Sequence, residues 1–156
     1  MIKQQVKNDF GLKGVYKFTL TDINTGEKKE IIYENIVPTV GRSLIANHLV
    51  NISPSPALVI TYVALGTGTS TPINANTTLQ TETYRKAIAS RTNASNVVLA
   101  TGFFDATETI GTYKEAGIFM GGSATANSGT LLSRVSVDIT KTNTQTLTIE
   151  WTLTIN

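Results

Sequence analysis

The sequence predicts a mainly β protein, an antiparallel two-sheet β-sandwich with one short α-helix near residues 39–50. Short segments of alternating apolar and polar residues are separated by clusters of Asn, Thr, Ser and Gly, a pattern typical of antiparallel strands joined by turns. In addition, the 156 residues suit one domain that buries roughly two thirds of its unfolded surface in a single core.

The first expected elements form a hairpin. Residues 12–22, LKGVYKFTLTD, place Tyr16, Phe18 and Leu20 on one face of a strand and polar residues on the other. The sequence Asn-Thr-Gly at 24–26 contains residues that tolerate a positive φ. The following segment, KKEIIYEN, is therefore expected to return as the second, antiparallel strand.

The helix is predicted from the next segment, NIVPTVGRSLIANHLVN, because Pro38 is tolerated only near a helix start. Its apolar residues recur at helical spacing and are expected to share a broad face, namely Val40, Leu44, Ile45 and Leu49. The prolines of SPSP end the helix. The run ALVITYVALG is then expected to form a strand buried on both faces.

The rest of the chain predicts further strands, near residues 80–92, 96–104, 112–120, 130–140 and 145–155. The closing segment QTLTIEWTLTIN has the clearest alternation, with Trp151 on its apolar face and Glu150 on its polar face. We expect this last strand to be central or nearly central in its sheet, with the Trp151 ring in the core.

Composition argues against several kinds of partner and of functional site for this chain. The net charge is only +2 and is spread along the sequence, so nucleic acid is not an expected partner. The absence of cysteine excludes disulfides, thiolate catalysis and cysteine zinc sites. The polar opening and the lack of an apolar run of about 18 residues predict neither a secretory signal nor a membrane segment.

A glycine-rich stretch, GTGTSTPINANTTLQTE at 66–82, raises the question of a phosphate-binding loop. A Walker loop needs a lysine after its last glycine, and the next lysine is Lys86. A dinucleotide fingerprint needs a third glycine and a helix where Pro72 stands. We therefore expect a surface connection in which Gly66 and Gly68 supply backbone freedom, and no cofactor.

Few residues could carry catalysis. His48 is the only histidine and lies within the apolar face of the predicted helix, where a structural role is expected. Asp105 and Glu108, with Glu115 beyond, could form an acid and base pair or hold a cation. Turn capping by Asp105 is the favoured alternative. We expect no catalytic residues and no metal site.

Four segments occur in a suggestive order: NIVPTVGRSLIANHL, ITYVALGTGTSTPINANTTLQTETYRKAI, ATGFFDATETIGTYKEAGIFMGG and GTLLSRVSVDITKTNTQTLTIEWTLTI. Together they cover about residues 35–156, and they resemble a widespread group of small tailed-bacteriophage virion proteins described as tail fibre or structural proteins. The markers are the ALGTGTSTP loop with Leu79, Glu82 and Arg85 after it, the element around Glu115, and the Trp151 strand.

The resemblance implies a non-enzymatic virion protein, made in the bacterial cytoplasm and present in many copies in the tail, fibre or baseplate or as a decoration on the capsid. Its expected partners are other copies of itself and other virion proteins. Threonine-rich strands and few charges suit a module whose affinity comes from avidity. Glu82, Arg85 and Glu115 are candidates for a structural polar network or a subunit contact, in which loss of one partner would cost about 3–5 kcal/mol.

Two alternatives remain open from the sequence. The first is a carbohydrate-binding host-recognition module of a phage fibre, with Tyr84, Tyr113 and Trp151 as candidates for stacking on a host glycan, although the register of Trp151 favours the core. The second is a glycosidase that uses Asp105 with Glu108 or Glu115.

The N-terminal residues 1–12, MIKQQVKNDFGL, are expected to form an arm outside a domain of residues 13–156. Ile2, Val6 and Phe10 recur every four residues between charged residues, so the segment is polar yet has three apolar anchors. We expect this arm to reach a neighbouring copy or another virion protein, and a loose tail is the alternative.

Overall fold

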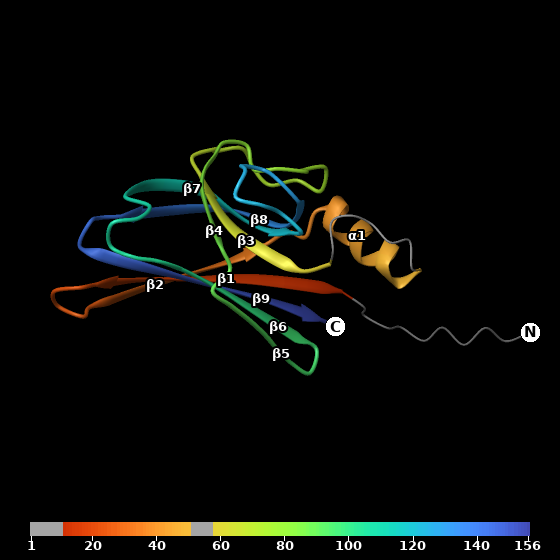
Figure 1. The fold of residues 1–156 in the computed structure, drawn as a ribbon, viewed down its shortest axis with the longest axis horizontal. Coiled ribbons are helices and arrows are strands. Elements are labelled where there is room, and N and C mark those ends of the chain that lie inside the picture. The colour runs from red at the N-terminus through yellow and green to blue at the C-terminus, as the bar shows by residue number, and fades with distance from the viewer. Residues whose placement is uncertain (1–10, 51–57) are drawn as a thin grey trace, which may run out of the picture.

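The structure is a computed structural model that describes residues 11–50 and 58–156. Two antiparallel sheets pack face to face, and one helix lies at one end of them (Figure 1). The predicted fold class, a mainly β two-sheet sandwich with one short helix, is confirmed. Among the described residues, no helix has the length and apolar character needed to cross a membrane.

The larger sheet has five strands in the order β2-β1-β9-β6-β5. Its strands are β1 (Leu12–Asp22), β2 (Lys28–Asn35), β5 (Ser90–Ala94), β6 (Val97–Phe104) and β9 (Gln145–Ile155). The C-terminal strand β9 lies at the centre, as predicted, and pairs with β1 along its whole length. The predicted hairpin is β1 and β2, and Gly26 in its turn has a φ of 72°.

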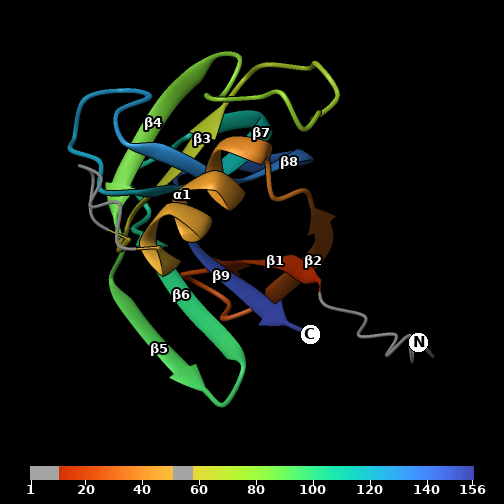
Figure 2. The same cartoon turned by 90° about the vertical axis from the view of Figure 1, so that its right-hand side faces the viewer.

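The smaller sheet has four strands in the order β4-β3-β7-β8. Its strands are β3 (Ile60–Gly66), β4 (Glu82–Ala87), β7 (Gly111–Met120) and β8 (Thr130–Lys141). Figure 1 shows this sheet above the larger one, with the loops 67–81 and 121–129 on the side that faces away from the larger sheet. Figure 2 shows the same arrangement after a quarter turn. The outer face of the smaller sheet is therefore covered by loops.

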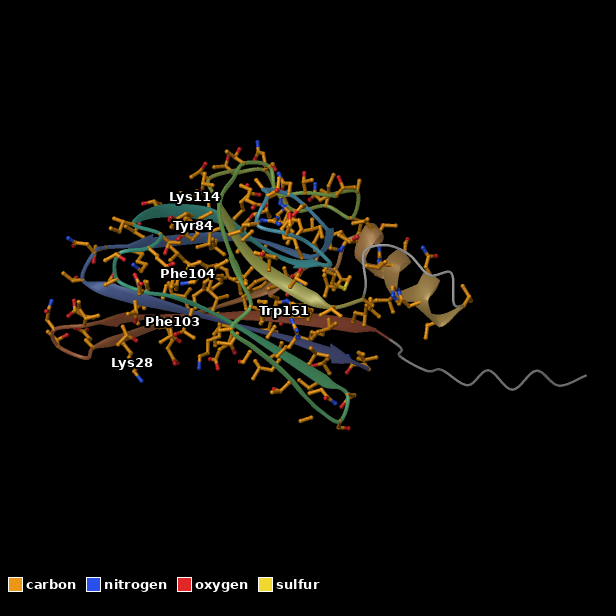
Figure 3. All side chains as sticks on the ribbon, viewed as in Figure 1. Lys28, Tyr84, Phe103, Phe104, Lys114 and Trp151 are labelled. Carbon is orange, nitrogen blue, oxygen red and sulfur yellow. The ribbon has the colours of Figure 1, made fainter. Side chains whose placement is uncertain are left out.

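The core lies between the sheets and follows the predicted alternation. Tyr16, Phe18 and Leu20 of β1 are buried, and Trp151 of β9 has no exposed surface. The two neighbouring phenylalanines of β6 point to opposite faces: Phe104 is fully buried, whereas Phe103 on the outer face is 44% exposed (Figure 3).

The helix α1 (Thr39–Leu49) matches the predicted span. Its face is narrower than predicted: Leu44 is buried and Ile45 packs against the core, but Leu49 is 83% exposed. The helix packs on β8. The span of the helix is therefore as predicted, whereas Leu49 does not share the buried face.

The predicted strand at 80–92 is two strands in different sheets. β4 belongs to the smaller sheet and β5 to the larger one. The chain crosses between them at Ile88 and Ala89, whose backbone N–H groups donate to Thr61 O and Thr101 O, one in each sheet. A continuous pattern of strand-forming residues does not reveal such a corner.

Most of the predicted arm, including Ile2, Val6 and Phe10, lies outside the described residues. Its last two residues, Gly11 and Leu12, are described. Leu12 starts β1, and Gly11 exchanges two backbone hydrogen bonds with Asn156. The last two residues of the predicted arm are thus paired with the end of the chain.

Candidate functional site

A buried carboxylate, Glu115 of β7, organises the outer face of the smaller sheet. Its Oε1 accepts hydrogen bonds from the backbone N–H groups of Gly68 and Thr81, at 3.2 and 2.7 Å. Its Oε2 accepts from Gln80 N at 2.9 Å and from Arg134 Nε and Nη2 at 3.1 and 2.8 Å. The Glu115 and Arg134 side chains are 0% and 1% exposed. The charge of each is thus compensated inside the protein.

Arg134 of β8 extends this anchor to the loop 67–81. Its Nη1 donates to Asn76 Oδ1 at 2.7 Å, and its Nη2 donates to Ser70 Oγ at 2.9 Å. The loop is therefore held near both ends and in the middle by one ion pair. Backbone N–H groups that would be unpaired in an irregular segment are satisfied by Glu115.

A second ion pair joins two residues of β4, Glu82 and Arg85, through bonds of 2.5 and 2.9 Å. Residues three apart in a regular strand point to opposite faces. Here a bulge changes the register, because Glu82 faces Gly66 whereas Tyr84 faces Leu65. The extra residue brings both charged side chains to the outer face.

Arg85 holds the second loop, 121–129, in the same way. Its Nη1 donates to the backbone oxygen of Ser123 and to Ser128 Oγ, at 2.8 and 2.9 Å. The guanidinium carbon also lies 4.6 Å from the ring centroid of Phe119, within the range of a cation–π contact. This loop is therefore fixed against the smaller sheet by a buried arginine.

The two loops are also joined to each other through Asn127. Its side-chain oxygen accepts from Leu79 N at 3.1 Å, and its backbone N–H donates to Glu82 at 2.9 Å. The three predicted network residues thus lie on the outer face of the smaller sheet, but they belong to two separate ion pairs. Glu82 pairs with Arg85, and Glu115 pairs with Arg134. Arg134 was not predicted from the sequence, although a single charge in the run LLSRVSV is the signal of a charged side chain that needs a buried partner.

The role predicted for Gly66 and Gly68 is wrong. Neither has the positive φ that favours glycine. Both are needed for close approach instead: a Cβ at Gly66 would lie 2.7 Å from Glu115 Oε1, and one at Gly68 would lie 2.5 Å from the Cβ of Gln80. The glycines make room for the Glu115 side chain.

We expect the Gly68→Ala substitution to lower the free energy of unfolding by about 1–3 kcal/mol, because the added methyl group displaces Glu115 or Gln80. Urea unfolding of both proteins measures the difference. Gly11→Ala is the matched control, since a Cβ at Gly11 meets nothing within 4 Å. Equal losses in the two variants would contradict the close approach.

The carboxylates of the glycosidase alternative are engaged in local structure. Asp105 Oδ1 accepts from Thr107 N and Oγ1, at 2.8 and 2.7 Å, as turn capping predicts. Glu108 forms an ion pair with Lys86 and accepts from Asp105 N at 2.9 Å. Glu115 belongs to the separate network described above. Among the described residues, no group of three or more potential metal ligands occurs.

A buried lysine, Lys141, also holds this turn and was not predicted. Its Nζ donates to the backbone oxygens of Ala106 and Glu108, at 3.1 and 2.7 Å. Burial lowers the pKa of Lys141 below its usual value. The lysine acts as a cap for the carbonyl groups of the loop that joins β6 to β7.

Glu108 is expected to make the free energy of unfolding depend on pH in the acid range. The hydrogen bond from Lys86, and then that from Asp105 N, hold the pKa of Glu108 below its ordinary value of 4.5. A folded-state pKa below the unfolded one gives stability that is present above pH 4.5 and lost as the pH falls through the lowered pKa. In Glu108→Gln this part of the acid dependence should disappear.

The measurement is urea unfolding of Glu108→Gln and of the unaltered protein at about pH 6 and about pH 3. Glu27→Gln, at an exposed position in the turn before β2, is the control. If acid destabilised Glu108→Gln as much as the unaltered protein, the assignment to Glu108 would be wrong.

The three aromatic candidates for glycan stacking do not form an exposed platform. Trp151 is fully buried and its Nε1 donates to Asn35 Oδ1, and Tyr113 is 6% exposed. Tyr84 is partly buried and donates to Glu108. These positions correct the aromatic set proposed for a glycan site.

His48 has the structural role expected for it. Its Nδ1 lies 3.0 Å from Leu44 O, one helical turn earlier, in the geometry of a hydrogen bond donated by the ring. The side chain is partly buried at the C-terminal end of α1.

An apolar groove, which we call the α1 groove, lies at the end of the sandwich near the helix. It consists of two cavities of about 450 and 490 Å³ that share Ile45 and Ile155. One lies against the β5–β6 hairpin and the other against the start of β1. Large apolar side chains are exposed in or beside it, namely Leu49, Val50, Leu58, Val59 and Ile155.

Compared with protein-family models, with curated proteins and with solved structures, the chain gave no match.

Proposed function

We propose that this protein is a non-enzymatic structural component of a tailed-bacteriophage particle, present in several copies and acting through contacts between subunits. The observation that carries this proposal is the apolar rim of the α1 groove. Leu49 and Val50 are 83% and 66% exposed beside a groove with mainly apolar walls. Contiguous exposed apolar surface typically marks a contact with another macromolecule.

Two further features support a structural role. The loops 67–81 and 121–129 are held by buried ion pairs, so a contact made through them would cost little ordering entropy. The resemblance to small virion proteins covers about residues 35–156, which includes both loops and the part of the α1 groove that the helix and β9 line. The proposal places the protein in the virus particle.

The test is to count this chain in particles produced by the genome that encodes it. Particles are purified on a density gradient, and quantitative mass spectrometry compares the chain with the other particle proteins. Several copies per particle, resistant to a salt wash, are expected. A chain that stays with the cell lysate and is absent from particles would refute the proposal.

Binding of a host glycan is the second candidate, and one observation favours it. The two anchored loops expose hydroxyl and amide groups on a rigid base, with Thr69, Thr71 and Asn74 among the exposed residues. Such a site would hold sugar by hydrogen bonds, since the three predicted aromatic residues do not form an exposed platform. A pull-down with host cell walls that recovers no protein would exclude it.

A further inference from the structure

The two halves of the α1 groove meet at Ile45 of the helix and Ile155 at the end of β9. One half is lined by Val98, Leu132 and Leu153 from the two sheets. The other half is lined by Leu12 and by Leu49 of the helix. The groove therefore offers a mainly apolar surface, with some polar lining residues, that can accept an extended segment with several apolar side chains.

Residues 1–10 of the predicted N-terminal arm lie outside the described residues, and they precede Gly11 at the rim of this groove. Gly11 lines the groove, and its backbone N–H and C=O are bonded to Asn156 at 3.2 and 2.9 Å. β9 ends there, and β2 ends opposite Gly14. Gly11 is thus the point at which the arm joins the described residues, the exit of the arm, and ten extended residues reach at most about 33–36 Å.

The arm has the pattern of a strand with one apolar face. In β1 the even-numbered residues Tyr16 and Phe18 face the core. The same alternation continues toward the N-terminus, where the apolar anchors Ile2, Val6 and Phe10 are all even-numbered. The charged residues of the arm are all odd-numbered, namely Lys3, Lys7 and Asp9. An extended arm therefore presents three apolar side chains on one side and its charges on the other.

We infer that the arm of one copy lies in the α1 groove of a second copy, and that the two copies exchange arms about a two-fold axis. The exit at Gly11 and the acceptor groove lie at the same end of each chain. A contact between these ends about a two-fold axis therefore brings the exit of each copy next to the groove of the other copy. The inference rests on the proposed function, since it takes contacts between copies as the means of action.

The exchange can be tested by cross-linking because the chain contains no cysteine. Val6→Cys places a thiol on the arm, and Ala46→Cys places one at an exposed position lining the groove. The two single-cysteine proteins are mixed and oxidised, and a double variant with both substitutions is oxidised separately. Val6→Cys mixed with Lys28→Cys is the control, because Lys28 lies at the opposite end of the molecule (Figure 3).

We expect a disulfide between Val6→Cys and Ala46→Cys chains, and at least tenfold less product with Lys28→Cys. A disulfide that forms only within single chains of the double variant would place the arm in its own groove and overturn the exchange. Absence of product in both the mixture and the double variant would also overturn it, because the arm would then not occupy the groove.

Light scattering of the full chain gives an independent readout. The unaltered protein is expected at twice the 16.8 kDa of one chain, and deletion of residues 2–10 is expected to reduce the mass to one chain. Leu49→Glu should have the same effect, whereas Ile32→Glu, at an exposed position on β2, should not. A monomeric unaltered protein would overturn the exchange. If the chain were nevertheless found in particles, the proposed function would stand.

Discussion

Glu115→Gln is expected to lower the free energy of unfolding by about 3–5 kcal/mol, the cost of removing one partner from a buried ion pair. Four donors converge on this carboxylate: three backbone N–H groups of the loop 67–81 and the guanidinium of Arg134. An amide replaces one acceptor oxygen with an NH₂ group, which then faces other donors. It also leaves the charge of Arg134 buried without compensation.

Urea unfolding measures this loss as a change in midpoint at constant slope. The matched control is Glu150→Gln, because Glu150 pairs with Lys17 on the exposed outer face of the larger sheet. Such pairs contribute about 0–1 kcal/mol. A loss below about 1 kcal/mol in Glu115→Gln would mean that the loop does not depend on this carboxylate.

Trp151→Ala is expected to destabilise the protein by about 3–5 kcal/mol, because it leaves a large cavity at the centre of the five-stranded sheet. The ring has no exposed surface and its centroid lies 6.5 Å from that of Tyr16. The substitution also leaves Asn35 Oδ1 without the donor Trp151 Nε1, 3.2 Å away.

The matched control for Trp151→Ala is Phe103→Ala, which removes an aromatic ring from the exposed outer face of the neighbouring strand. Thermal or urea unfolding should give a loss within about 0.5 kcal/mol for this control. If Phe103→Ala cost as much as Trp151→Ala, the assignment of the two faces would be reversed.

The strands β1 and β9 could be predicted from the sequence because each buries one face and leaves the other in water. Alternation with a period of two then fixes which side chains enter the core, as it did for Tyr16 and Trp151. The span of the helix could also be predicted, because Pro38 and the spacing of the apolar residues are signals within the segment itself.

Features that depend on contacts between distant segments could not be predicted in this way. The bulge beside Gly66, which brings Glu82 and Arg85 to one face, depends on how β4 pairs with β3. The pairing of Glu115 with Arg134 depends on the register of β7 with β8. Local patterns contain neither register, so three residues of the network were predicted, whereas Arg134 and the pairing of the charges were not.

The central claim, that this chain acts as a repeated structural part of a virus particle, is tested most directly by a reconstruction of the intact particle. The account predicts density for the sandwich at several equivalent positions, with the α1 groove against a neighbouring chain. A reconstruction in which this chain has no density, or in which the α1 groove faces solvent in every copy, would contradict it.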